Sequence, residues 1–388
     1  MSGIAQNPTH FFILNTERKI QMRSERFDTH DIFSTMFHMM KIKYYEYGKS
    51  ISAMNFVQPT DKINVFINME AVLRYISTIS HVDEKIMAER DFSTILESGA
   101  INLCAHYKRF FREEGLETRV FMYYTNLESD EFDNFKYNNE YRSFYMNKFT
   151  MNPRFKAIGE AMIDDVDPNL TTTMQFIPGI NFISCIGIEG SIIPLIIANS
   201  DPTYKNFIIT TDMYESQYQL LPNQFCVHII RRSNNGTVIL DNLKSSIWTL
   251  LGKDYKEKGI DISILTNPTF YNLVLSADGD KERSIESLKG IGRVTMLKLI
   301  HEAINRKKIT PDTTSLDMVL DAIHIEKKDI LENSFKCTDI FSQYKDLTEV
   351  KKHSILNQVV DRFDYNSIIT LNQTKYKDYP LMLQELTM

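Results

Sequence analysis

Hydrophobic and polar positions along the chain alternate between short apolar runs and longer stretches of helical periodicity. Two β-branched and aromatic runs, Lys62–Asn68 and Arg119–Tyr124, predict buried strands. A third strand is expected within 174–188 and a fourth over Phe207–Thr211. Because helical stretches separate these strands, the pattern predicts a parallel sheet that helices cover on both faces.

The remaining elements are a helix, a hairpin and a helical C-terminal part. A helix is expected over Glu189–Asn199, with Pro194 either in its first turn or kinking it. The runs Cys226–Arg232 and Thr237–Leu240 are joined through an Asn-Gly pair and predict a β-hairpin. From about Ser284 onward the pattern is mostly helical.

Three parts are expected along the chain: an N-terminal extension over 1–60, an α/β domain over 61–275, and a helical region over 276–388. The extension includes a stretch, Thr29–Met40, with the pattern of an amphipathic helix packed on another surface. This extension is therefore a candidate site for a protein partner.

Residues 288–292, Leu-Lys-Gly-Ile-Gly, are typical of a turn between two helices. Gly290 and Gly292 permit positive φ and leave no Cβ to obstruct a ligand. The N–H groups at the start of the following helix attract phosphate. Three basic residues lie in or after the turn: Lys289, Arg293 and Lys298. This indicates a helix–hairpin–helix that grips a nucleic-acid backbone without reading bases; the alternative is a tight αα-hairpin with a glycine C-cap.

The run before this turn carries a family resemblance. Gly279-Asp280, with Asp280 ten residues before Gly290, resembles the GD-x-x-D-x-x-x-x-x-x-GIG run of the flap endonuclease/5′-nuclease family, which includes the phage RNase H enzymes. In that family both aspartates belong to the metal site, and here Arg283 stands at the second position. The resemblance implies a PIN/flap-endonuclease-like α/β sheet, followed by a helix–hairpin–helix and a C-terminal helical region.

The resemblance extends over roughly 62–300 and implies a metal site with few carboxylates. Glu189, Asp212 and Asp280 match acidic positions of the family and are the expected metal-binding and catalytic residues; Gln217 also matches. Where the family has further acidic residues, this chain has Asn68, Thr125, Ser191 or Ile192, Tyr214 and Arg283.

This loss of charge limits the number of ions. Two divalent ions close together need anionic ligands to offset their repulsion, whereas Asn68 and Thr125 are neutral and Arg283 is cationic. Magnesium can be held by one or two carboxylates with substrate phosphates, so one Mg²⁺ or Mn²⁺ ion at most is expected, or none. Three neighbouring carboxylates would be able to compensate: Glu70, Glu128 and Glu215. Taken singly, each acidic residue is also consistent with an ordinary surface carboxylate.

The region 130–156 is polar, aromatic and irregular. It occupies the place of the family's helical gateway, where Arg142 and Lys148 would contact the phosphates of a single-stranded end and Tyr141 would stack on a base. The alternative is an ordinary surface loop whose tyrosines pack on the core.

Composition narrows the class of protein. The net charge of −6 over 388 residues excludes a generally basic coat, so nucleic-acid contacts must be local. The four cysteines are far apart and predict free thiols in a reducing compartment. No apolar run approaches a membrane span, and the N-terminus lacks the pattern of a secretory signal. A cytoplasmic protein without membrane contact is expected, in a host cytoplasm if the source is viral.

Three functions are consistent with these features. The first is a degenerate 5′-nuclease that binds branched or single-strand-ended DNA or RNA–DNA hybrid and cleaves weakly or not at all. The second is an active Mg-dependent 5′-nuclease or RNase H with a rearranged site. The third is a structural or assembly protein that reuses the fold.

Overall fold

The computed structural model describes residues 61–69, 104, 107, 108, 111, 115–125, 180–183, 188–210, 212–221, 224–229, 238–240, 261–279 and 285–359. All of them belong to one compact unit, Ser50–Met388, and the other unit, Met1–Lys49, lies outside the described residues. The expected amphipathic helix over Thr29–Met40, the region 130–156 with Arg142 and Lys148, and the pair Asp280 and Arg283 are therefore not placed.

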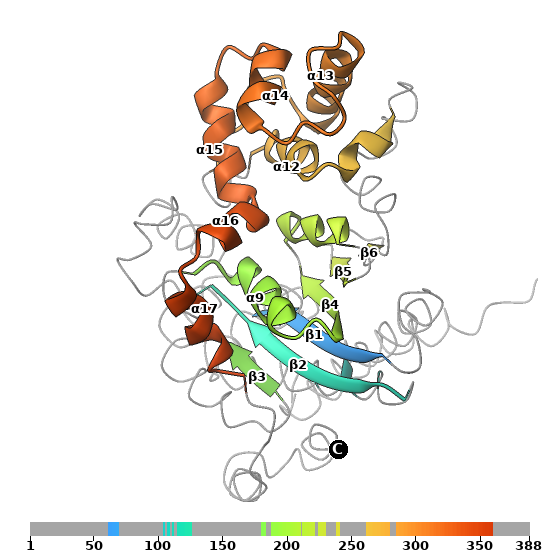
Figure 1. Cartoon of the computed structure of the whole chain (residues 1–388), viewed down its shortest axis with the longest axis vertical. Helices are drawn as coiled ribbons and strands as arrows, with labels where there is room; N and C mark the ends of the chain where they lie inside the picture. The colour runs from blue at the N-terminus through green and yellow to red at the C-terminus, as the bar shows by residue number, and fades with distance from the viewer. Residues whose placement is uncertain are drawn as a thin grey trace, which may run out of the picture. The chain divides into compact units, whose positions relative to one another are not determined.

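One sheet of six strands forms the α/β core, in the order β3-β2-β1-β4-β5-β6 (Figure 1). Its strands are β1 (Lys62–Asn68), β2 (Glu117–Tyr123), β3 (Ile180–Ile183), β4 (Tyr204–Thr210), β5 (Phe225–Ile229) and β6 (Val238–Leu240). The first five run parallel, and β6 pairs antiparallel with β5. The predicted parallel sheet and the predicted hairpin are both confirmed.

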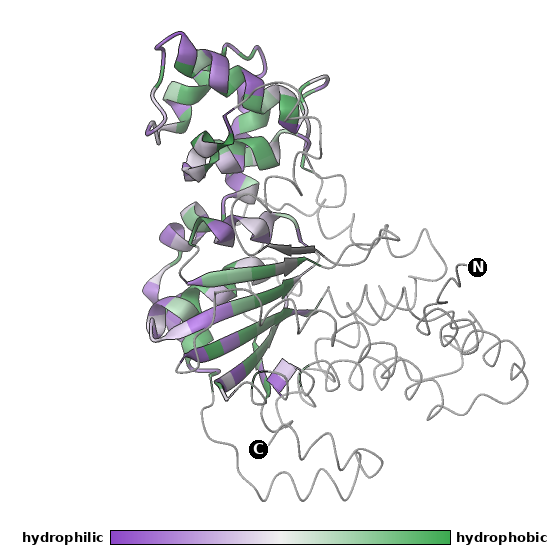
Figure 2. Ribbon diagram, turned by 90° about the vertical axis from the view of Figure 1, so that its right-hand side faces the viewer, coloured by the Kyte–Doolittle hydropathy of each residue, from purple (hydrophilic) through white to green (hydrophobic). Residues whose placement is uncertain are grey.

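The central strands β1 and β4 are buried at nearly every position and apolar in their middle, as expected for a parallel sheet covered on both faces (Figure 2). Their register is marked by a buried polar ladder. Asn64 pairs with Arg119 on one side and with Asn206 on the other. The Arg119 Nε donates to the Asn64 Oδ1 at 2.9 Å, and the Asn64 Nδ2 donates to the Asn206 Oδ1 at 2.9 Å. A slip of one residue would break both bonds, so the ladder helps to hold the strand ends level.

Helical elements follow the strands and fill the C-terminal part. They are η3 (Gly190–Ile192), α9 (Ile193–Ser200), η4 (Tyr214–Leu220), η5 (Ile262–Thr266), α12 (Pro268–Ser276), α13 (Arg293–Asn305), α14 (Leu316–Ile323), α15 (Lys328–Thr338), α16 (Ile340–Asp346) and α17 (Glu349–Leu356). Pro194 lies in the first turn of α9, where it needs no hydrogen-bond donor, so the first of the two expectations for this proline is confirmed.

Both faces of the sheet are covered. On one face α9 packs on the strands together with Ile340, Leu347 and Ile355 from the α16–α17 segment. On the other face Phe207 of β4 contacts the rings of Tyr107 and Phe111, which are helical. The chain thus returns to the sheet after its helical region.

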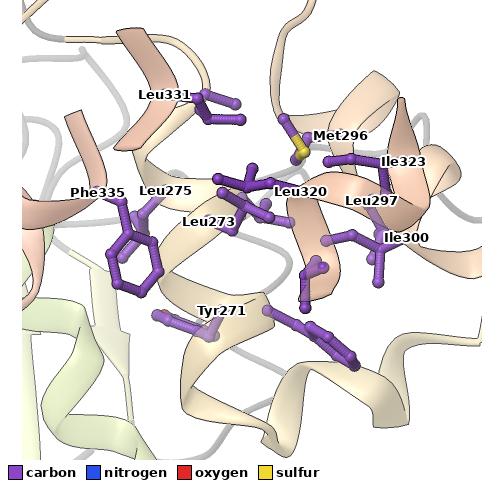
Figure 3. Packing of buried hydrophobic residues seen from close by; sticks show 14 of the residues in the cluster. Tyr271, Leu273, Leu275, Met296, Leu297, Ile300, Leu320, Ile323, Leu331 and Phe335 are labelled. Carbon is purple, nitrogen blue, oxygen red and sulfur yellow. The ribbon is translucent and has the colours of Figure 1, made fainter. Parts of the chain in front are cut away.

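The helices α12, α13, α14 and α15 share a second hydrophobic core (Figure 3). Tyr271 and Leu273 of α12 lie among Leu297 and Ile300 of α13 and Leu320 of α14. Since α12 packs with the helices that follow it, this core joins residues on both sides of the expected boundary at 275, and the division into 61–275 and 276–388 stays a prediction. No helix in the described residues is long and apolar enough to cross a membrane.

Candidate functional site

Five polar side chains meet at the carboxyl ends of β1, β2 and β4, and we call them the strand-end cluster: Asn68, Tyr123, Thr210, Asp212 and Glu215. Asn68 pairs with Tyr123 across β1 and β2, and β4 ends at Thr210 on the other side of β1. Glu215, in η4, accepts hydrogen bonds from the Asn68 Nδ2 at 3.2 Å and from the Tyr123 hydroxyl, at 2.9 and 2.8 Å to its two carboxylate oxygens. The Thr210 hydroxyl also hydrogen-bonds to it.

Glu215 is completely buried, with 0% of its surface exposed. Burial raises the pKa of Glu215 well above its usual range, and the negative charge of Asp212 raises it further; hydrogen bonds from Thr210, Tyr123 and Asn68 offset part of this. Burial likewise raises the pKa of Tyr123, with the Glu215 charge adding to the shift. Glu215 is therefore sealed by protein donors, and as it lies it is not accessible as a metal ligand. In the sequence, only its position three residues after Asp212 indicates that Glu215 could belong to this site.

Asp212 follows β4 and is 8% exposed. Its carboxylate Oδ1 accepts from the Tyr214 N–H at 2.8 Å, and its own N–H donates to the Thr210 hydroxyl at 2.9 Å. These bonds fix the turn from β4 into η4. Tyr214, at a position where the resemblance expects an aspartate, is buried in the hydrophobic core of the helical region. The side chain at position 214 thus packs against the helices of the helical region.

Glu189 begins a tight turn, Glu189–Ser191, that leads through η3 into α9; we call it the Glu189 turn. Its side chain is 4% exposed. The Thr125 hydroxyl, just after β2, donates to the Glu189 Oε1 at 3.4 Å and accepts from the Gly190 N–H at 2.9 Å. Thr125, another position where the resemblance expects an aspartate, therefore serves as a neutral hydrogen-bond partner of the Glu189 turn.

The expected convergence of Glu189, Asp212 and Asp280 stays a prediction, because Asp280 lies outside the described residues. Glu189 contacts Thr125 just beyond β2, and the Asp212 charge acts on Tyr123 at the end of β2. Both residues therefore border the same strand end. Within the described residues, no group of three His, Cys, Asp or Glu side chains has an arrangement that would hold a metal ion.

The turn at 288–291 is closed by a hydrogen bond from the Ile291 N–H to the Leu288 carbonyl oxygen at 3.0 Å. Gly290 has a φ of +83°, a conformation that requires glycine, and both Gly290 and Lys289 are exposed. Gly292 has an ordinary φ of −89° and caps α13. A Cβ there would lie 3.0 Å from the Asp278 carboxylate, so a larger residue at 292 would crowd this side chain.

The expectation of a helix directly before this turn is wrong for residues 285–288, which are not helical. The nearest described helix before them is α12, which ends at Ser276. Gly279, with a φ of +62°, bends the chain after α12, and a Cβ there would lie 2.5 Å from the Ile285 carbonyl oxygen. The backbone at Gly279 therefore lies close to the backbone at Ile285, and Ile285 and Leu288 are buried in the helical core.

The start of α13 already holds a carboxylate. The Asp278 Oδ1 accepts from the Arg293 N–H at 3.2 Å, and the Asp278 Oδ2 lies 3.0 Å from the Arg293 Nε. Asp278 thus occupies the place where a phosphate was expected. Lys298 pairs with Glu302 at 3.8 Å, and both side chains are exposed. Of the three expected cations, two therefore have carboxylate partners within the protein.

Gln217 has a structural role. Its amide Nε2 donates to the carbonyl oxygens of Tyr214 at 3.0 Å and Thr338 at 2.6 Å. The neighbouring Ser216 hydroxyl receives a hydrogen bond from Tyr271 at 3.0 Å. η4 therefore presents Glu215 to the sheet and its next two residues to the helical region.

Neither a protein-family model nor a curated protein sequence matches this chain. Solved structures do match it. The bacteriophage T5 5′-exonuclease with bound zinc ions is 11% identical, with a TM-score of 0.47, covering 76% of this chain and 97% of that one. A T5 flap endonuclease complex with DNA and metal ions is 12% identical, with a TM-score of 0.41 and coverages of 84% and 99%. The catalytic core of Rad2 with a DNA substrate is 11% identical, with a TM-score of 0.36 and coverages of 84% and 93%. The chain is similar to these 5′-nucleases in fold, at identities that carry over none of their residues.

Proposed function

We propose that this protein binds the sugar–phosphate backbone of branched or single-strand-ended DNA, or of RNA–DNA hybrid. We further propose that its phosphodiesterase activity is weak or absent. Two neutral residues at strand ends, Asn68 and Thr125, support the proposal of weak or absent activity. Asn68 donates to Glu215, and Thr125 is bound to the Glu189 turn. These are two of the positions where the resemblance expects metal-binding aspartates. Both side chains are neutral and already hydrogen-bonded within the protein, so neither offers a charged oxygen to an ion.

One divalent ion still fits the carboxylates that remain. Glu189 and Asp212 carry hard anionic oxygens of the kind that Mg²⁺ and Mn²⁺ prefer, and Asp280 is expected to join them. An ion bound there would neutralise charge on a phosphate group of the nucleic acid. Glu189 and Asp212 would hold it, and Glu215, sealed under its donors, would stay outside its ligands. A second ion lacks anionic ligands among the described residues.

The turn at 288–291 is the proposed backbone contact. Lys289 and Gly290 are exposed, so a phosphate can approach the turn closely. An incoming phosphate would compete with Asp278 for the Arg293 guanidinium and N–H. This competition predicts modest affinity, which suits binding that requires a second contact, such as the one expected from Arg142 and Lys148 in 130–156.

Fluorescence anisotropy tests the binding. Wild type is titrated against labelled 5′-flap DNA, duplex, single strand and RNA–DNA hybrid over a range of salt concentrations in EDTA. Lys289→Glu should weaken binding to all sequences and reduce the salt slope by about one. Lys345→Glu is the matched control, because Lys345 is also an exposed lysine but lies on α16. Equal effects of the two variants, or no binding even at low salt, would remove the turn from the function.

A cleavage assay separates the alternatives. The same substrates are incubated with Mg²⁺ or Mn²⁺, and little or no product is expected. If wild type cleaves efficiently and Asp212→Ala abolishes the cleavage, this proposal is wrong and the protein is an active nuclease with a rearranged site. A protein that neither cleaves nor binds nucleic acid would be assigned to the structural class.

A further inference from the structure

Three consecutive residues of the Glu189 turn are held from two sides by elements distant in sequence. From the sheet side, the Thr125 hydroxyl accepts from the Gly190 N–H at 2.9 Å and donates to the Glu189 Oε1 at 3.4 Å. From the η4 side, the Tyr218 hydroxyl donates to the Ser191 carbonyl oxygen at 2.6 Å. The carboxylate of Glu189 thus sits on a backbone that has little freedom to shift.

Gly190 shows how closely this turn is pressed on the end of β2. A Cβ built at Gly190 would lie 2.8 Å from both the Thr125 backbone nitrogen and the Tyr124 carbonyl carbon. Both are backbone atoms, which have no rotamer by which to move aside. No larger residue fits here without displacing the Glu189 turn, so glycine is required by the approach of the two segments and not by its φ.

The η4 side is equally fixed. Tyr218 is completely buried, and its ring stacks near Phe225 of β5 with centroids 4.6 Å apart. Its own segment is anchored to the helical region by the hydrogen bond from Gln217 to the Thr338 carbonyl oxygen. A hydroxyl held in this way acts as a rigid donor toward Ser191.

We infer that Thr125 and Tyr218 are positioning residues for the carboxylate of Glu189, which they aim at the divalent ion of the proposed function. The inference rests on that proposed function. It gives the neutral residue at 125 a role that an aspartate would not fill. A carboxylate there would accept from the Gly190 N–H but would repel Glu189, whereas the threonine hydroxyl both accepts and donates.

Binding of Mn²⁺, followed by electron paramagnetic resonance, tests the inference without relying on activity. Thr125→Val keeps the shape and removes the hydroxyl, and Thr125→Ser keeps the hydroxyl. Loss of an outer hydrogen-bond partner of a ligand typically lowers metal affinity about 10- to 100-fold. Thr125→Val should therefore weaken Mn²⁺ binding by about tenfold or more, and Thr125→Ser should stay close to wild type. Tyr218→Phe, which removes the hydroxyl that donates to Ser191, should weaken Mn²⁺ binding as well.

The control is the urea unfolding midpoint of each variant, so that affinities are compared only between folded proteins. If Thr125→Val fails to fold, Tyr218→Phe decides the question by the same criterion. Wild-type affinity in the valine or phenylalanine variant overturns the positioning role and leaves the proposed function standing. Failure of wild type to bind Mn²⁺, with nucleic-acid binding intact, overturns the metal part of the proposed function and the positioning role with it.

Discussion

Replacing Glu215 with alanine should destabilise the protein far more than replacing it with glutamine. In the native protein its carboxylate accepts from the Tyr123 hydroxyl, the Asn68 amide and the Thr210 hydroxyl. Alanine leaves all three donors buried without this acceptor, and each such group costs about 1–3 kcal/mol. Even at the lower limit, the free energy of unfolding should fall by about 3 kcal/mol, a large part of the about 5–15 kcal/mol typical of a domain.

Glutamine keeps an acceptor oxygen of the same reach, so Glu215→Gln should cost less than about 1 kcal/mol near neutral pH. It also removes the titration. Because burial and the Asp212 charge raise the pKa of Glu215 in the folded protein, the folded state holds this proton more tightly than the unfolded state. Glu215 therefore contributes stability at low pH that is lost as pH rises through its folded pKa. The glutamine variant lacks this loss and should gain on wild type as pH increases.

Urea unfolding, followed by circular dichroism in EDTA, measures both effects. Midpoints are compared for wild type, Glu215→Gln and Glu215→Ala across a pH series, and equal slopes with urea establish that the comparison reports stability. If alanine costs no more than glutamine, the strand-end cluster is not a sealed hydrogen-bond network. If the gap between glutamine and wild type does not change with pH, Glu215 does not titrate as its surroundings imply.

Three further changes test other features of the protein. Gly190→Ala places a Cβ 2.8 Å from backbone atoms at the end of β2. It should lower the free energy of unfolding, measured in urea, by about 1–3 kcal/mol. An unfolding midpoint equal to that of wild type would refute the close approach. Asn68→Asp replaces a donor to Glu215 with a second carboxyl and should lower the thermal midpoint in EDTA; an unchanged midpoint would mean that the Asn68 donor contributes little to stability. Removing Arg142 and Lys148 should weaken binding to flap DNA more than to duplex in anisotropy titrations, whereas equal losses favour a surface loop.

The sheet was predictable because burial of a parallel strand leaves a plain signature in sequence. Lys62–Asn68 has β-branched or aromatic residues at Ile63 and Val65–Ile67, and the structure has a strand over the same residues. The Asn-Gly pair likewise indicated the hairpin of β5 and β6, whose pairing is confirmed. These signals are local: each depends on side chains a few positions apart, whose preferences do not need the rest of the chain.

The strand-end cluster was not predictable in the same way, since its bonds join residues far apart in sequence. Asn68 and Glu215 are separated by 147 positions, and only the strand order brings them into contact. For the same reason, the contact of Asp278 with the start of α13 was not predictable. Its carboxylate contacts the start of α13, 15 positions further along the chain, and no local pattern reveals that the helix end is already occupied. The family resemblance predicted which positions lack an acidic residue, but not the hydrogen-bond partners of the residues that stand there.

These partners would make aspartate unequally tolerated at the three positions. At Asn68 an aspartate would face Glu215, which can respond by keeping its proton, so the change is the mildest. At Thr125 an aspartate would retain the bond from Gly190 but oppose Glu189, and only a cation between them would relieve the repulsion. At Tyr214 an aspartate would enter the hydrophobic core of the helical region, where an unpaired carboxylate is strongly disfavoured with or without metal. Aspartates at these three positions would therefore not be enough to make a metal site: η4 would also have to repack so that position 214 faced the strand ends instead of the helices.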